Sequence, residues 1–187
     1  QGLPPRSIVE ILLAHYRERG EASLDGLTGA FAVVLFDPAN QLAAIARDGM
    51  GNHALAYCLT AGELVSSPDE AVVSSATGVP GPLCALRLAE FYGFEELSGP
   101  STFFSNVQAL LPGEMIVLQA GKVRRRWLTR PRLDARRERA RWEEYVEEFA
   151  ELLSAGVRRC LGGVERVGVL MSGGLDSTPI AALAARH

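Results

Sequence analysis

The sequence predicts an α+β domain followed by the beginning of an α/β domain. Between residues 30 and 127, short apolar segments alternate with turns rich in Gly, Pro and Asn, which is typical of antiparallel hairpins. Further on, the apolar run 167–171 precedes a glycine-rich turn and a helix-forming segment. That order predicts a buried parallel strand, a turn and a helix.

The composition is that of a globular protein without a nucleic-acid or membrane partner. Of the 187 residues, 48% are hydrophobic and 22% are charged, and the formal net charge is -3. No apolar run is long enough to cross a bilayer, and the first residues do not form a signal peptide. The three cysteines are scattered outside any metal-ligand spacing, so we expect reduced thiols in a cytoplasmic protein.

The first domain is predicted to combine three hairpins with three helices. A helix over residues 7–19 would begin at an N-cap Ser7 and end at Gly20. The strands of the first hairpin, 30–36 and 41–46, are both expected to be largely buried. The other predicted elements are hairpins 54–58/63–66 and 114–119/122–127, and helices 69–75 and 83–93.

Three later stretches have distinct compositions. The basic run 122–126 could form an anion site, but we interpret it as one solvated strand face. Residues 129–140 are charged, contain Pro131 and are predicted to be a linker. Apolar residues at helical spacing over 141–161 predict a long amphipathic helix.

Residues 172–178 have the composition of a phosphate-binding turn. Gly173 and Gly174 allow unusual backbone angles, and the helix that follows would direct N–H groups and its positive dipole end at an anion. Pro179 suits the first helical position, with Ser177 or Thr178 as cap. Asp176 would repel a bare phosphate, which indicates an intervening Mg²⁺ ion.

This turn resembles the Ser-Gly-Gly-x-Asp-Ser loop of the ATP pyrophosphatase family, whose members cleave ATP between its α- and β-phosphates. The resemblance implies ATP and Mg²⁺ as cofactors, with Asp176 at the metal. The residues implied in ATP binding are Leu170, Ser172, Gly173, Gly174, Asp176, Ser177 and Thr178. No catalytic residue is assigned.

Four stretches resemble the class II glutamine amidotransferase domain of the asparagine synthetase family, in that family's order: 27–32, 46–51, 64–71 and 107–114. The resemblance implies an N-terminal-nucleophile αββα sandwich, lacking its first strands, over residues 1–128. After the linker 129–140, residues 141–187 would begin a parallel-sheet ATP pyrophosphatase domain. Because the loop lies so close to His187, we expect this chain to be a fragment.

Departures from the family pattern favour a branch without glutaminase activity. The family's leading Cys and its Asn-Gly-Glu loop are absent here, although both could lie upstream of Gln1. Ile8 stands where the family has an Asp that holds the α-amino group of glutamine, and His53-Ala54 replace a basic residue and Pro. The resemblance is therefore to β-lactam synthetases and lasso-peptide cyclases.

The sequence thus predicts an amide-forming ligase that adenylates a small-molecule or peptide carboxylate for attack by an amine. Two alternatives stay open at this stage. One is a glutamine-hydrolysing asparagine synthetase with an upstream Cys, and the other is a non-catalytic peptide-binding scaffold. A homodimer or a peptide-processing partner is also left open.

Overall fold

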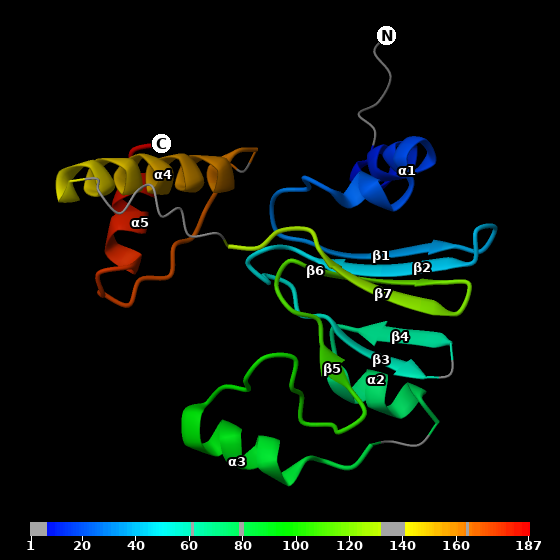
Figure 1. Cartoon of the computed structure of the whole chain (residues 1–187). Helices are drawn as coiled ribbons and strands as arrows, with labels where there is room; N and C mark the ends of the chain where they lie inside the picture. The colour runs from blue at the N-terminus through cyan, green and yellow to red at the C-terminus, as the bar shows by residue number, and fades with distance from the viewer. Residues whose placement is uncertain (1–6, 61, 79–80, 132–140, 164) are drawn as a thin grey trace. The chain divides into compact units, whose positions relative to one another are not determined.

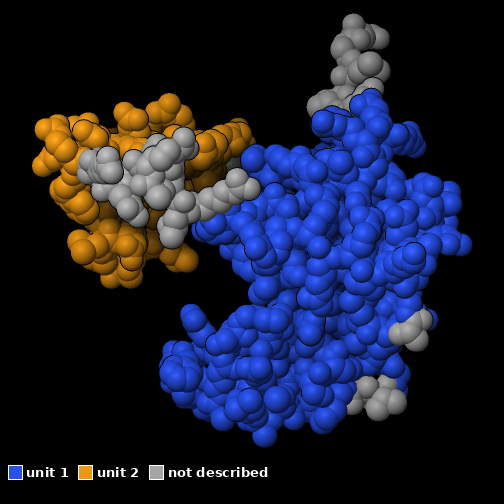
Figure 2. Space-filling model, viewed as in Figure 1, with its two compact units in different colours: residues 1–131 blue, residues 132–187 orange. Residues whose placement is uncertain are grey.

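A computed structural model describes residues 7–60, 62–78, 81–131, 141–163 and 165–187. The chain divides into two compact units, residues 1–131 and 132–187, which Figure 2 shows in different colours.

The first unit contains two antiparallel sheets. One has the strand order β1-β2-β6-β7 and the other the order β4-β3-β5 (Figure 1). The strands are β1 (Ala32–Asp37), β2 (Leu42–Arg47), β3 (Ala56–Thr60), β4 (Glu63–Ser67), β5 (Gln108–Ala109), β6 (Glu114–Gln119) and β7 (Lys122–Trp127). The helices are α1 (Ile8–Arg19), the 3₁₀ helix η1 (Gly20–Leu24), α2 (Glu70–Ala76) and α3 (Ala85–Phe94).

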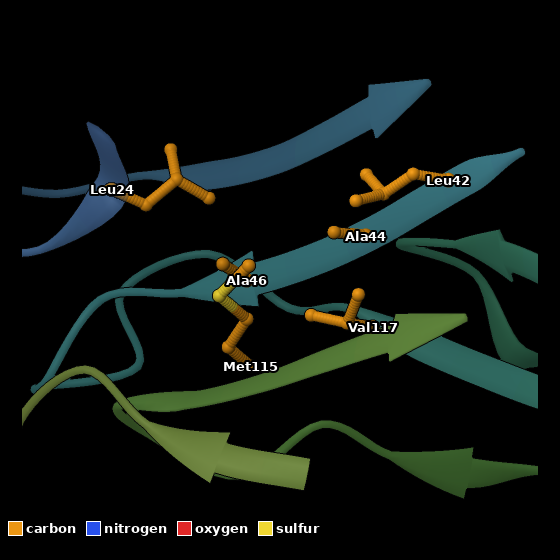
Figure 3. Packing of buried hydrophobic residues seen from close by; sticks show 6 residues of the cluster. All are labelled: Leu24, Leu42, Ala44, Ala46, Met115 and Val117. Carbon is orange, nitrogen blue, oxygen red and sulfur yellow. The ribbon is translucent and has the colours of Figure 1, made fainter. Parts of the chain in front are cut away.

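Alternation along the strands builds a core of three clusters. One face of β2 and β6 packs under Leu24 of η1, as Figure 3 shows for Leu24, Leu42, Ala44, Ala46, Met115 and Val117. The opposite face meets β3 in a cluster of Ile45, Leu55, Tyr57, Leu110 and Ile116. The outer face of β3 packs against Val73 of α2. The resulting order, helix–sheet–sheet–helix, is compatible with the αββα sandwich that the resemblance implies (Figure 1).

Most local predictions for this unit are confirmed. Ser7 caps α1 through a capping box: its hydroxyl accepts from the Glu10 N–H at 3.2 Å, and the Glu10 carboxylate accepts from the Ser7 N–H at 2.7 Å. The cap after the last residue of α1 is Gly20. All three predicted hairpins form, within two residues of their expected strands.

Two predictions about strands of the first unit are wrong. β1 is not largely buried, because it lies at a sheet edge, and Val34 and Phe36 are 63% and 74% exposed. The basic run is not one solvated face, because successive residues of a strand point to opposite faces. Arg124 pairs with Glu21 of η1 and Arg126 with Asp25 directly after η1, whereas Arg125 pairs with Glu114.

The second unit contains the predicted amphipathic helix, α4 (Trp142–Leu161), and α5 (Ser177–Ala184). The predicted strand over residues 167–171 is wrong for this structure. A strand needs a hydrogen-bonded neighbour, and the described residues of this unit provide none. Leu170 is accordingly 96% exposed, and the parallel sheet remains a prediction.

Among the described helices, none combines the length and the apolar character that crossing a membrane requires.

Candidate functional site

The candidate nucleotide site is the turn that precedes α5. The helix begins at Ser177, with Asp176 at the N-cap position, and the Asp176 side chain makes no capping bond. The prediction that Ser177 or Thr178 caps the helix is therefore wrong, as is the placement of Pro179 at the first helical position. Pro179 is the third helical residue, where an N–H has no intrahelical acceptor in any case, so proline is still tolerated.

Three hydroxyl groups hold this turn together. Ser177 Oγ accepts from the Ser172 N–H at 3.2 Å and lies 3.2 Å from Ser172 Oγ. Ser172 Oγ in turn accepts from the Gly174 N–H at 3.4 Å. Thr178 Oγ1 donates to the Gly174 carbonyl at 2.8 Å. The structure thus brings Ser172, Gly174, Ser177 and Thr178 together, and the three hydroxyl groups bond within the loop.

The backbone of the turn leaves several donors unused. Among the described residues, no acceptor bonds the N–H groups of Gly173, Leu175, Asp176 or Ser177. Gly173 has a φ of +78°, a conformation that favours glycine and that helps to expose successive N–H groups on one side of a turn. Free N–H groups at the positive end of a helix dipole form a site suited to an anion.

Asp176 and Leu170 lie beside these donors in the sequence and are exposed. Asp176 is the only carboxylate within residues 170–178. Among the described residues, no group of three or more His, Cys, Asp or Glu side chains could by itself hold a metal ion. A Mg²⁺ ion at Asp176 would therefore take most of its oxygen ligands from phosphate and water, as is usual for this ion.

The first unit carries a second candidate, a cavity of about 620 Å³ between α1 and β1. Its lining is largely apolar and includes Ile8, Leu12, Phe31 and Val33. No Asp, Glu, Lys or Arg belongs to the described lining. Ile8 lies in this cavity, so the position at which the family pattern has an Asp faces a space without a carboxylate.

Asp48 is the centre of a hydrogen-bond network in the first unit and belongs to the stretch 46–51. The residue follows β2 and is 1% exposed. Its carboxylate accepts from the N–H groups of Met50 at 2.9 Å, Asn52 at 3.0 Å and Phe31 at 3.3 Å. The Asn52 side chain adds a bond at 2.9 Å. Burial alone would raise the pKa of Asp48, but these hydrogen bonds outweigh it and hold the pKa below its ordinary value.

Arg47 and Gly113 extend the hydrogen-bond network around Asp48. The Arg47 guanidinium donates to the carbonyls of Leu110 at 2.7 Å and Gly51 at 2.5 Å, and the Gly113 N–H donates to the Asp48 carbonyl at 2.8 Å. The stretches 46–51 and 107–114 are therefore held together in space. A buried Asp that accepts from its own loop is a structural residue, and its position directly after a buried strand was the sequence signal for it.

Comparison with known proteins assigns the chain. Residues 4–128 match the family model described as a glutamine amidotransferase domain, and residues 148–187 match the model described as asparagine synthase. The chain belongs to the asparagine synthetase family. The family resemblance drawn from the sequence is thereby confirmed.

The curated relatives carry two kinds of name. "Asparagine synthetase [glutamine-hydrolyzing] 2" of Bacillus subtilis is 26% identical over 94% of this chain and 25% of its own length. "Probable asparagine synthetase [glutamine-hydrolyzing]" of Schizosaccharomyces pombe is 30% identical over 95% of this chain and 27% of its own. "Amidase chyE" of Penicillium rubens is 31% identical over 94% of this chain and 26% of its own. The chain spans about a quarter of the length of these relatives.

Proposed function

We propose that the protein containing this chain is an ATP-dependent, AMP-forming carbon–nitrogen ligase that lacks glutaminase activity. Its substrate would be the carboxylate of a small molecule or peptide, and the attacking amine would belong to the substrate itself, as in a lasso-peptide cyclase or a β-lactam synthetase. The observation that carries the ligase proposal is the turn 172–178, which has free N–H groups at a helix start and lies inside the stretch matched by the asparagine synthase model.

The chain's own residues would act mainly by positioning. The N–H groups of Gly173, Leu175 and Asp176 would bind the pyrophosphate oxygens of ATP, and the backbone around Leu170 would lie beside the adenosine. Ser172, Ser177 and Thr178 would keep the turn in shape and could exchange their internal bonds for phosphate oxygens. Asp176 would hold Mg²⁺, which supplies charge neutralisation for the leaving pyrophosphate.

In the proposed reaction, a carboxylate oxygen attacks the α-phosphorus of ATP and pyrophosphate leaves. The amine then attacks the acyl carbon, AMP leaves with the bond electrons, and the amine loses a proton as the amide forms. The turn supplies neither nucleophile nor base, so its contribution is orientation and stabilisation of negative charge.

The proposed loss of glutaminase activity rests on Ile8. An α-amino group bound beside Ile8 in the α1–β1 cavity would find no carboxylate in the described lining and would therefore lack an ion-pair partner. The names of two relatives support the competing candidate, a glutamine-hydrolysing asparagine synthetase. The substitution Ile8→Asp would restore a carboxylate to the cavity. Glutamate release from glutamine by the parent protein and by this variant therefore distinguishes the two candidates.

The test of the ligase proposal uses the full-length protein and follows AMP release from ATP. Asp176→Ala is expected to lower AMP formation at least 100-fold, because it removes the proposed metal ligand. The matched control is Glu151→Ala, which removes the same charge from an exposed position on α4. Equal activity of the two variants would show that Asp176 has no part in the reaction.

A further inference from the structure

A second, smaller cavity of about 280 Å³ lies in the first unit where β3 meets β7 and the segment before β5. We call it the Arg125 pocket. Its polar lining consists of Tyr57, Ser105, Asn106, Gln108 and Arg125, and Cys58 and Leu59 complete the described lining. Among the described residues of this lining, Arg125 is the only charged side chain. The pocket shares none of the residues assigned above to the turn or to the α1–β1 cavity.

Gln108 is oriented by two donors. Its Oε1 accepts from the Tyr57 hydroxyl at 2.5 Å and from Arg125 Nη2 at 3.0 Å. Because a guanidinium can only donate, the atom that faces it must be the amide oxygen, which fixes the orientation of the amide. Gln108 Nε2 therefore keeps both of its hydrogens, and no acceptor bonds it within the described part of the chain.

Arg125 is anchored but retains free donors. Its nearest carboxylate oxygen, Glu114 Oε1, lies 3.5 Å from Nη1, and the other oxygen of Glu114 already accepts from the Leu111 N–H at 3.0 Å. The guanidinium also lies over the Tyr57 ring, with Cζ 5.7 Å from the ring centroid. Tyr57 and Glu114 are nearly fully buried, whereas Arg125 is 49% exposed. Two buried side chains thus hold the Arg125 guanidinium in place while about half of it stays exposed to solvent.

We propose that the Arg125 pocket binds a small monoanionic carboxylate. Arg125, Gln108 Nε2 and the Ser105 hydroxyl are all donors in one cavity, and no Asp or Glu belongs to the described lining. The buried Glu114 offsets part of the Arg125 charge, which favours a single negative charge over a phosphate dianion. The volume suits a small organic acid such as an acylated amino acid.

The test measures binding of N-acetylglycine to the full-length protein by ligand-observed saturation-transfer NMR, with inorganic phosphate as competitor. Arg125→Gln is expected to weaken binding at least tenfold. Arg124→Gln is the matched control, because it removes the same charge from the opposite face of the same strand, where Arg124 pairs with Glu21. We expect the control to bind like the parent protein.

Ser105→Ala provides a second variant that leaves the anchoring bonds intact, and we expect binding to weaken about threefold to tenfold. Absence of binding by the parent protein at millimolar concentration would overturn the proposal. So would equal weakening by Arg124→Gln and Arg125→Gln, which would indicate nonspecific attraction, or unchanged binding in Ser105→Ala and Arg125→Gln. Phosphate that binds more tightly than N-acetylglycine would overturn the assignment to a carboxylate.

Discussion

Two glycine-containing loops with one aspartate each fulfil opposite tasks in this molecule. The loop after β2 buries Asp48 and directs the N–H groups of Phe31, Met50 and Asn52 at its carboxylate. The loop before α5 exposes Asp176 and leaves neighbouring N–H groups without acceptors among the described residues. The first loop is saturated by its own bonds and stabilises a fold, whereas the second leaves its donors open to the ligand proposed above.

The largest effect on stability should come from Asp48→Ala. The substitution leaves the N–H groups of Phe31, Met50 and Asn52 without their acceptor, which should cost about 3–5 kcal/mol in the free energy of unfolding of the first unit. Hydrogen exchange of the β2 and β6 amides in the full-length protein would measure the loss.

Asp176→Ala is the counterpart in the second loop, and protection of the same β2 and β6 amides should stay within about 0.5 kcal/mol of the parent value. If both substitutions lowered protection equally, or neither did, the distinction between a saturated and an open loop would be wrong.

Substitution of Gly113 in the first unit and of Gly173 in the second extends the comparison. Gly113 has a φ of +75°, and a Cβ there would collide with the backbone carbonyl of Thr129, so Gly113→Ala should destabilise the first unit by about 2–4 kcal/mol. Gly173 has a φ of +78° but open space around the Cβ position, so Gly173→Ala should cost about 1–2 kcal/mol from backbone strain alone. Thermal unfolding of the two variants would rank them, and a larger loss for Gly173→Ala would contradict the account.

The stability of the first unit should depend on pH through the ionisation of Asp48. Its folded pKa is below the ordinary value, so its contribution is fully present above the unfolded pKa of about 3.9. The contribution is lost as the pH falls through the folded pKa. Acid unfolding of the first unit should therefore have a smaller pH dependence in Asp48→Asn than in the parent protein. Identical acid transitions would mean that Asp48 ionises alike in the folded and unfolded states.

The smallest effect concerns the cap of α1. Ser7→Ala removes one half of the capping box and should destabilise α1 by about 1 kcal/mol. Ser7→Thr is the control, since its hydroxyl can still accept from the Glu10 N–H. Hydrogen exchange of the first-turn amides of α1 would report the change, and equal protection in the two variants would argue against a role for the cap.

The sequence predicted the first unit well because its signals are local. Turn residues between short apolar segments located all three hairpins, and Ser7 with Gly20 bounded α1. The exposure of β1 could not be predicted, because it depends on which strands become neighbours. The run 167–171 was misassigned for the same reason: an apolar run predicts the tendency to form a strand, but pairing requires a partner.

The candidate sites divide in a similar way. Residues 172–178 were recognisable from composition and order, since glycines, hydroxyls and an aspartate between a strand signal and a helix form a local pattern. The Arg125 pocket was not recognisable, because Tyr57, Gln108 and Arg125 lie far apart in the sequence and meet only when the sheets pack. Strand alternation alone could have separated Arg125 from Arg124 and Arg126.

The most direct test of the proposed function measures AMP and glutamate in one reaction of the full-length protein with ATP, Mg²⁺, glutamine and amine-bearing peptides. We expect AMP formation without release of glutamate. Release of glutamate in proportion to AMP would contradict it and would show that the protein is a glutamine-hydrolysing synthetase in spite of Ile8.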